Sequence, residues 1–219
     1  MGLPPGDNET AQQVVRAAAF RAAGSSNATF HSTPLAAVLP PKPSVLLQGI
    51  LTFGAKTAEG RLIEIVAPPW YKIIELLERD PAVMYQMTSE QWEHMVAGAY
   101  SKAGFEEVIV TPRSGDRGID VIAVKHGIGT VRIIDQVKAY RPGHLVTADD
   151  VRALLGVLHA DNASKGFLTT TSDFAPKLPE DILLKPYIPS RLELVNGEKL
   201  LARLKELREI SAGLGVNDQ

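Results

Sequence analysis

The sequence predicts an α/β protein with a mixed central β-sheet flanked by helices, preceded by an N-terminal hairpin-plus-helix extension. Three observations support this class. From residue 88 onward helix and strand patterns alternate, two capping boxes mark helix starts, and apolar residues recur at helical spacing. The chain has 219 residues, 45% of them hydrophobic and 22% charged, which suffices for one domain of ordinary size plus some extra length.

The composition excludes several classes of protein. The absence of cysteine excludes a disulfide scaffold, a thiol nucleophile and a zinc site built on sulfur, and the five histidines form no H-x-x-x-H pair. No run approaches 18 uninterrupted apolar residues, and the first residues lack the basic and apolar regions of a signal peptide, so we expect a cytoplasmic protein without a membrane span. The net charge of −2 gives no global electrostatic case for nucleic acid.

Residues 1–86 are interpreted as an N-terminal extension. An alanine-rich stretch, residues 11–23, predicts a short helix that is either mobile or packed on another subunit. A stiff proline connector follows at residues 40–43. After it the pattern predicts a β-hairpin with a loop over 54–60, and then a helix that Asp80-Pro81 ends. The two strands and the helix are expected at residues 44–53, 61–66 and 70–79.

Residues 87–219 form the predicted main domain. Thr88 and Gln91 make a capping box for a helix that ends at Gly104, and Thr147 with Asp150 makes a second one. Asn196 is the predicted N-cap of a last helix. Strands are expected at residues 108–111, 119–124, 131–138, 166–171 and 191–195.

One strand carries polar residues that suggest chemistry. Gln136 and Lys138 share a face of the strand 131–138 and lie about 7 Å apart, because side chains alternate across a strand. Asp120 stands at the entry of the neighbouring strand. An acid, an amide and a lysine there could hold Mg²⁺ and activate a water. The spacing alone also allows a structural interpretation, in which Asp120 ends a turn, Gln136 bonds an edge and Lys138 enters solvent.

Glu93 is a further acidic candidate. It follows Trp92 and lies in line with Val96 and Tyr100, so it borders the apolar face of its helix. A carboxylate at that border points toward the edge of the sheet more than a solvent-facing glutamate would. The alternative interpretation is a surface glutamate whose stem lies along apolar neighbours.

Five segments with distinctive residues follow one another along the chain: 92–105, 115–122, 136–140, 151–172 and 195–200. They contain a helix with an acidic residue, a glycine-rich turn before Asp120, the Q-x-K sequence Gln136-Val137-Lys138, a helix and strand, and a turn into the last helix. Together, over about 120 residues, they resemble the catalytic domain of Mrr-type restriction endonucleases, within the PD-(D/E)-x-K nuclease superfamily.

The resemblance implies a restriction-endonuclease-like fold and Mg²⁺-dependent hydrolysis of phosphodiester bonds in DNA, with Mn²⁺ able to substitute. Asp120 would bind the metal, Gln136 would replace the usual second acid, and the carbonyl of Val137 would also face the metal. Lys138 would position and activate the water, and Glu93 would assist at the metal or through a water.

DNA contacts are expected near this site. Arg117 stands where the family often has glycine, so it either contacts a phosphate or lies on the surface. Arg141, Lys165 and Ser172 are further candidates for the phosphate backbone, with ordinary loop and cap chemistry as the alternative. The charges of the last helix balance one another and indicate a solvated face.

The sequence thus predicts a metal-dependent DNA endonuclease of restriction or defence type. One alternative is a structure-selective nuclease that acts on junctions or damaged DNA, and another is a non-catalytic DNA-binding or assembly module with the same fold. Because one site cuts one strand, we also expect a homodimer or a higher homo-oligomer.

Overall fold

The computed structural model describes residues 49–112 and 118–214, with no side chains described beyond residue 211. Seven strands form one sheet, and their order in the sheet is their order in the chain. The strands are β1 Leu51–Lys56, β2 Arg61–Val66, β3 Glu107–Val110, β4 Val121–Lys125, β5 Val131–Lys138, β6 Lys165–Thr170 and β7 Leu192–Val195.

The pairing of neighbouring strands changes once across the sheet, from antiparallel to parallel. β1 to β5 pair antiparallel in succession, whereas β5 pairs parallel with β6 and β6 with β7. Parallel neighbours need a crossover connection, and helix α5, Ala148–Ala160, supplies it between β5 and β6. The predicted mixed sheet is therefore confirmed.

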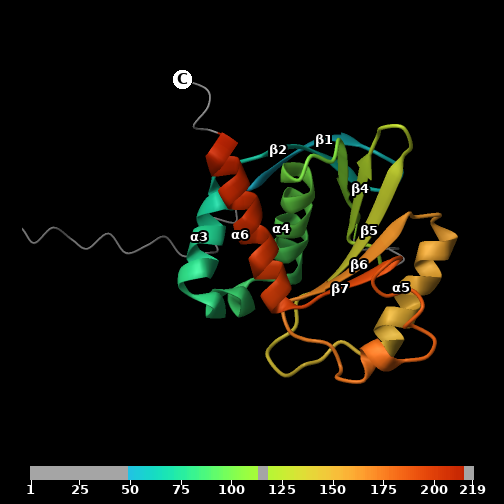
Figure 1. Ribbon diagram of the computed structural model, residues 1–219. Coiled ribbons are helices and arrows are strands. Elements are labelled where there is room, and N and C mark those ends of the chain that lie inside the picture. Colours follow the sequence, from blue (N-terminus) through green and yellow to red (C-terminus); the bar gives the residue numbers. More distant parts are fainter. Residues whose placement is uncertain (1–48, 113–117, 215–219) are drawn as a thin grey trace, which may run out of the picture. The chain divides into compact units, whose positions relative to one another are not determined.

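Helices cover both faces of the sheet (Figure 1). Helices α3 (Pro69–Arg79), α4 (Ser89–Lys102) and α6 (Gly197–Leu214) pack with one face around the largest apolar cluster, which includes Trp70 and Trp92. Helix α5 covers the other face with a second cluster. We call these the α4 face and the α5 face. None of the described helices combines the length and apolar character that a membrane span requires.

The predicted hairpin and helix before residue 87 are present, and they share the sheet and the core of the later residues. β2 pairs with β3 through Arg61↔Val110 and Leu62↔Ile109. Ile63 of β2 is buried in the same cluster as Trp92. The predicted domain limit at residue 86 thus falls between α3 and α4, inside one continuous sheet and core. The alanine-rich stretch 11–23 lies outside the described residues.

Three local details differ from the predictions. Strand β1 begins at Leu51, whereas the strand was predicted from residue 44; residues 44–48 lie outside the described residues, and Gly49 and Ile50 precede the strand. The strand continues through Gly54 to Lys56, and the turn is short because the Thr57 hydroxyl accepts hydrogen bonds from the N–H groups of Glu59 (3.2 Å) and Gly60 (3.1 Å). Strand β4 begins at Val121, two residues later than expected. A 3₁₀ helix, Pro81–Gln86, continues the chain after α3 where no element was predicted.

The three predicted helix starts are confirmed. Thr88 and Gln91 exchange hydrogen bonds as a capping box at α4, and Thr147 and Asp150 do the same at α5. The N–H of Lys199 donates to Oδ1 of Asn196 at 3.1 Å at the start of α6. Each cap satisfies backbone N–H groups that have no partner inside the helix.

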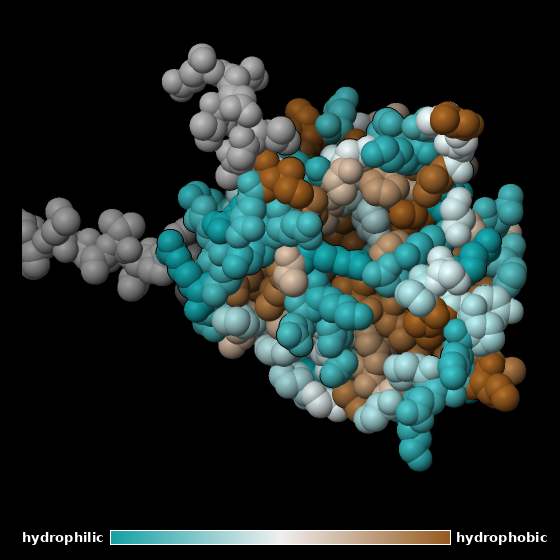
Figure 2. Space-filling model, in the orientation of Figure 1, coloured by the Kyte–Doolittle hydropathy of each residue, from teal (hydrophilic) through white to brown (hydrophobic). Residues whose placement is uncertain are grey.

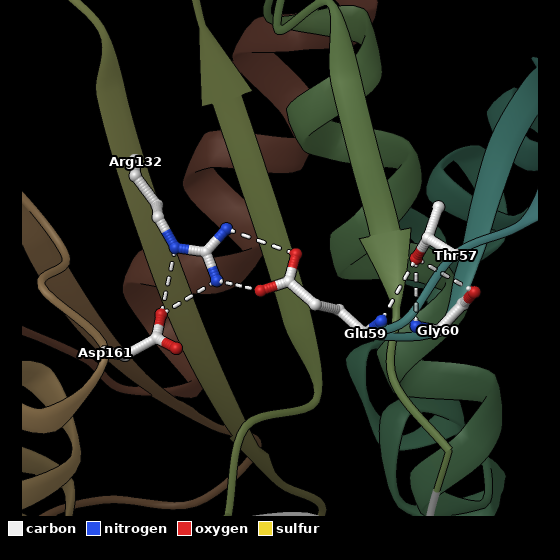
Figure 3. A network of polar contacts seen from close by, with 5 residues as sticks. All are labelled: Thr57, Glu59, Gly60, Arg132 and Asp161. Atoms are coloured by element: carbon white, nitrogen blue, oxygen red, sulfur yellow. Dashed lines mark hydrogen bonds and ion pairs between the residues drawn. The ribbon is translucent and has the colours of Figure 1, made fainter.

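A charged network ties the hairpin turn to the connection between α5 and β6. Figure 3 shows Arg132 of β5 between Glu59 and Asp161. Its guanidinium lies 2.6 Å from Glu59 Oε1, while Nε donates to Asp161 Oδ2 at 2.9 Å. Thr57 holds the turn that presents Glu59. Arg132 thereby joins Glu59, 73 residues away in the chain, to Asp161, 29 residues away.

Candidate active site

Asp120 lies at the end of the sheet where β3 ends and β4 begins. Its backbone N–H donates to the carbonyl of Asp135 on β5 at 3.0 Å, and its own carbonyl accepts from Thr111 N–H at 3.1 Å. Its Oδ2 accepts the backbone N–H of Val137 at 2.6 Å. Backbone bonds on both sides therefore fix this carboxylate against strand β5, next to the predicted Q-x-K residues.

Gln136 and Lys138 lie on the α5 face of strand β5. Alternation places them there, because Ile134 of the same strand belongs to the cluster under α5. Gly118, with φ +74°, packs directly against the amide of Gln136. The positive φ favours glycine at position 118, and a Cβ there would lie 2.7 Å from Gln136 Nε2 and would displace this amide.

The ammonium group of Lys138 faces the start of helix α5. Its Nζ lies 3.8 Å from Oδ1 of Asp150, and both side chains are a quarter exposed. Partial burial opposes ionisation of Asp150, but hydrogen bonds from Thr147 and the charge of Lys138 bring its pKa below the ordinary 3.8. The carbonyl of Lys138 accepts the Thr170 hydroxyl at 2.8 Å. The capping box therefore also holds a counter-charge beside Lys138.

Glu93 approaches the same end of the sheet from the α4 face. Its side chain is only 6% exposed, which is unusual for a glutamate. It lines a cavity of about 510 Å³ together with Thr111, the residue bonded to the Asp120 backbone. Glu93 therefore lies on the same side of the sheet as this cavity, whereas Gln136 and Lys138 lie on the opposite face.

Of the predicted DNA-contacting residues, the structure places two near Lys138 and one at the other end of the strands. Arg141 is exposed three residues after Lys138, and Ser172 follows β6 at the end where Thr170 pairs with Lys138. Lys165 pairs with Ile133 instead, about 16 Å along the strands from that end. Its ammonium binds Glu193 at 2.5 Å. Arg117 lies outside the described residues.

A buried acid next to Gln136 escaped the sequence analysis. Asp135 points to the α4 face and is 2% exposed. Its Oδ2 accepts hydrogen bonds from Tyr100 (2.9 Å) and Thr169 (3.1 Å), while Oδ1 has no partner among the described residues. Burial raises the pKa of Asp135 to about 8, against the lowering effect of these two hydrogen bonds. Burial and the neighbouring Asp135 also raise the pKa of Tyr100.

This acid connects helix α4 to the strand that carries the candidate site. Tyr100 of α4 holds its side chain, and its backbone carbonyl accepts the Asp120 N–H. It lines a cavity of about 350 Å³ between α4, α6 and the sheet, and Figure 2 shows hydrophobic side chains in a recess on this side of the molecule. The available signal was an acid directly after the apolar pair Ile133-Ile134 in a predicted strand.

The oxygen atoms near Asp120 are of the kind that Mg²⁺ prefers as ligands. Within residues 49–112 and 118–211, no three or more His, Asp or Glu side chains gather as a metal site. The oxygens that this end of the sheet could offer to a divalent ion are the Asp120 carboxylate and the neutral oxygens of Gln136 and Val137, while the Glu93 carboxylate approaches from the α4 face. Mg²⁺ prefers oxygen ligands, keeps several waters and tolerates such a sparse protein shell.

The solved structures similar to this chain include two restriction endonucleases. One is MspJI in complex with a 27-mer oligonucleotide, with 16% identity and a TM-score of 0.44, covering 70% of this chain and 35% of the other. The other is the DNA modification-dependent restriction endonuclease AspBHI, with 15% identity, a TM-score of 0.38 and coverages of 68% and 41%. The chain thus spans well under half of either protein. No curated protein matches its sequence significantly.

A family model gives the assignment. The Mrr catalytic-domain model, described as restriction endonuclease, matches residues 84–204, which is more than half of the chain. This segment runs from the 3₁₀ helix before α4 into α6 and contains Glu93, Asp120, Gln136 and Lys138. The chain belongs to the restriction endonuclease family defined by the Mrr catalytic domain.

Proposed function

We propose that this protein is a metal-dependent DNA endonuclease of restriction or defence type. One observation carries the proposal: Asp120, Gln136 and Lys138 meet at one end of the sheet, inside the segment that matches the family. The Asp120 carboxylate is bonded to the Val137 N–H at 2.6 Å, so the acid and the Q-x-K strand form one unit.

The proposed metal site uses oxygens of three residues. Asp120 would bind Mg²⁺, or Mn²⁺ in its place, with the Gln136 amide oxygen and the Val137 carbonyl, and Glu93 would act at the metal or through a water. When bound, the ion supplies charge relief on the phosphoryl oxygens and lowers the pKa of a coordinated water. Because Gln136 is neutral, we expect weaker metal binding than at a site with two carboxylates.

Lys138 would serve the hydrolysis directly. In this reaction the oxygen of a water forms a bond to phosphorus as the water gives up a proton, the P–O bond to the sugar breaks, and the leaving oxygen takes up a proton. The ammonium of Lys138 orients the attacking water by hydrogen bonding and balances charge on the phosphate. Asp150, 3.8 Å away, keeps this side chain turned toward the start of α5.

The proposed DNA contacts come from basic and polar residues around the site. Arg141 and Ser172 lie at the same sheet end as Lys138 and would bind the phosphate backbone. Arg117 and Lys165 remain predictions, and Lys165 would first have to leave Glu193. Two chains would be needed to cut both strands, and light scattering of the purified protein tests this expected dimer.

A plasmid-cleavage assay tests the function. Supercoiled DNA is incubated with wild type, Asp120→Ala and Lys138→Ala, each with Mg²⁺, Mn²⁺ or EDTA. We expect cleavage only with a divalent ion and a rate loss of about 10²-fold or more in both variants. Asp149→Ala removes a 90% exposed acid on α5 and is the matched control, which should cleave at the wild-type rate.

The alternatives give different outcomes. Cleavage confined to branched or damaged DNA would replace the restriction role with structure-selective cleavage. The non-catalytic module is favoured by the neutral Gln136 and by the sparse carboxylates. Equal DNA binding with Mg²⁺ and with EDTA, and no cleavage of any substrate by folded wild type, would establish it instead. Undiminished cleavage by both variants would refute the proposed site.

A further inference from the structure

Hairpin β1–β2 contributes two basic residues to the cavity that Glu93 lines. Lys56 ends β1 and Arg61 begins β2, and both border the cavity of about 510 Å³ with Glu93, His94 and Thr111. Both basic side chains are exposed. The hairpin precedes residues 84–204, so these cations lie outside the segment that matches the family.

The cavity adjoins the candidate active site through the sheet. Arg61 pairs with Val110, and Val110 pairs with Val121, the residue after Asp120. Because neighbouring strands are about 4.8 Å apart, the backbones of Arg61 and Val121 are separated by about 10 Å. A DNA strand carries one phosphate per ~3.4 Å of helix axis, so this spacing corresponds to a few phosphates.

The two cations are available for an anion. Neither Lys56 nor Arg61 makes an ion pair within residues 49–112 and 118–211. Arg132 and Arg208, by contrast, are each bound to two acids. Glu90 also lines the cavity, without an ion pair to either hairpin cation.

An aromatic support orients Arg61. Its guanidinium carbon lies 4.5 Å from the centre of the Phe53 ring, and that ring meets His94 edge-on at 5.4 Å. Stacking holds the flat face of a guanidinium and leaves its N–H edge for two parallel bonds to phosphate oxygens. A solvated surface arginine would not need such a platform.

We propose that Lys56 and Arg61 form a phosphate-binding subsite of the hairpin that holds duplex DNA a few phosphates away from the bond to be cut. This inference rests on the proposed function and deepens it. The subsite positions the DNA backbone without reading its sequence. It would add binding energy from a part of the chain that the family model does not include.

The test measures duplex binding as a function of salt. A labelled 20-base-pair duplex is titrated with wild type and with Lys56→Ala/Arg61→Ala by fluorescence anisotropy in EDTA between 50 and 200 mM salt. Each lost phosphate contact removes about 0.9 from the slope of log K against log salt, so we expect a decrease of about 1.8. At 100 mM salt, we expect Kd to rise about tenfold or more.

A charge-matched control separates the subsite from general electrostatics. Lys125→Ala/Lys185→Ala removes two exposed cations, at the far end of β4 and in the β6–β7 connection, and should leave Kd within about twofold. Arg61→Lys keeps the charge, so it should retain most of the slope with a weaker Kd. Circular dichroism verifies that each variant is folded.

The outcomes distinguish this proposal from the proposed function. An unchanged slope and Kd in Lys56→Ala/Arg61→Ala, or equal losses in the control, would overturn the subsite even if the enzyme cuts DNA. So would a wild type that binds no duplex. A smaller slope of log K against log salt in Lys56→Ala/Arg61→Ala alone, in a protein that never cleaves DNA, would support the subsite and count against the nuclease.

Discussion

Replacing Asp135 by asparagine should stabilise the protein more at high pH than at low pH. The carboxyl is 2% exposed, and only one of its oxygens has hydrogen-bond partners among the described residues. An asparagine carbonyl can accept the same bonds from Tyr100 and Thr169. The substitution therefore removes the ionisation while it keeps the shape and the bonds of the side chain.

The magnitude follows from linkage between proton binding and folding. Burial raises the pKa of Asp135 from 3.8 to about 8, so between these values the folded protein keeps a proton that the unfolded chain releases. The stabilisation that this proton contributes is therefore fully present below pH 3.8, and it is lost by about 1.4 kcal/mol per pH unit as pH rises toward 8. From pH 5 to pH 8 we expect the free energy of unfolding of wild type to fall by about 4 kcal/mol relative to Asp135→Asn.

Urea unfolding at pH 5, 6, 7 and 8 measures this difference, with EDTA present to exclude divalent ions. The fluorescence of Trp70 and Trp92, both fully buried, reports unfolding. Asp150→Asn is the control: the folded-state pKa of Asp150 lies below its ordinary value, so this acid is ionised in both states above pH 5 and its effect should not vary. A constant difference between wild type and Asp135→Asn from pH 5 to pH 8 would refute the argument.

Two further stability predictions concern close packing and charge. Gly98→Ala in α4 should lower the free energy of unfolding by about 2–3 kcal/mol although alanine favours helices, because the new Cβ would lie 2.5 Å from Trp70 Nε1. In Gly156→Ala of α5 the new Cβ meets no atom within 4 Å, so this variant should gain about 0.5–1 kcal/mol of stability. The midpoints of urea unfolding compare the two variants. Arg132→Ala should cost about 1–2 kcal/mol at low salt and less at 1 M salt, because it frees Glu59 from its ion pair; an unchanged melting temperature at low salt would contradict this.

Local signals predicted most of the elements. Thr88, Thr147 and Asn196 act within three or four residues of their own position, so the helix starts could be read directly from the sequence. The strand predicted at residues 131–138 likewise coincides with β5 at both ends. The pairing of β2 with β3 joins Arg61 to Val110 and Leu62 to Ile109, far apart in the chain, and neither strand alone indicates its partner.

The candidate site was predictable only in part for the same reason. Asp120, Gln136 and Lys138 followed from a strand and the turn before its neighbour, together with the resemblance to a family. Lys165 lies away from them because β6 runs parallel to β5, which places the start of one beside the start of the other. Asp135 was missed because its partner, Tyr100, is 35 residues away on another element.

The two edges of the sheet limit how copies of this chain can associate. The outer strand β1 changes register against β2 twice, between Thr52 and Phe53 and again before Lys56, and β7 at the other edge has only four residues. Irregular, charged or very short edges resist the addition of a further strand. Among the described residues, neither edge strand therefore favours joining two copies into one fourteen-strand sheet, and we expect a dimer to meet through helices or loops instead.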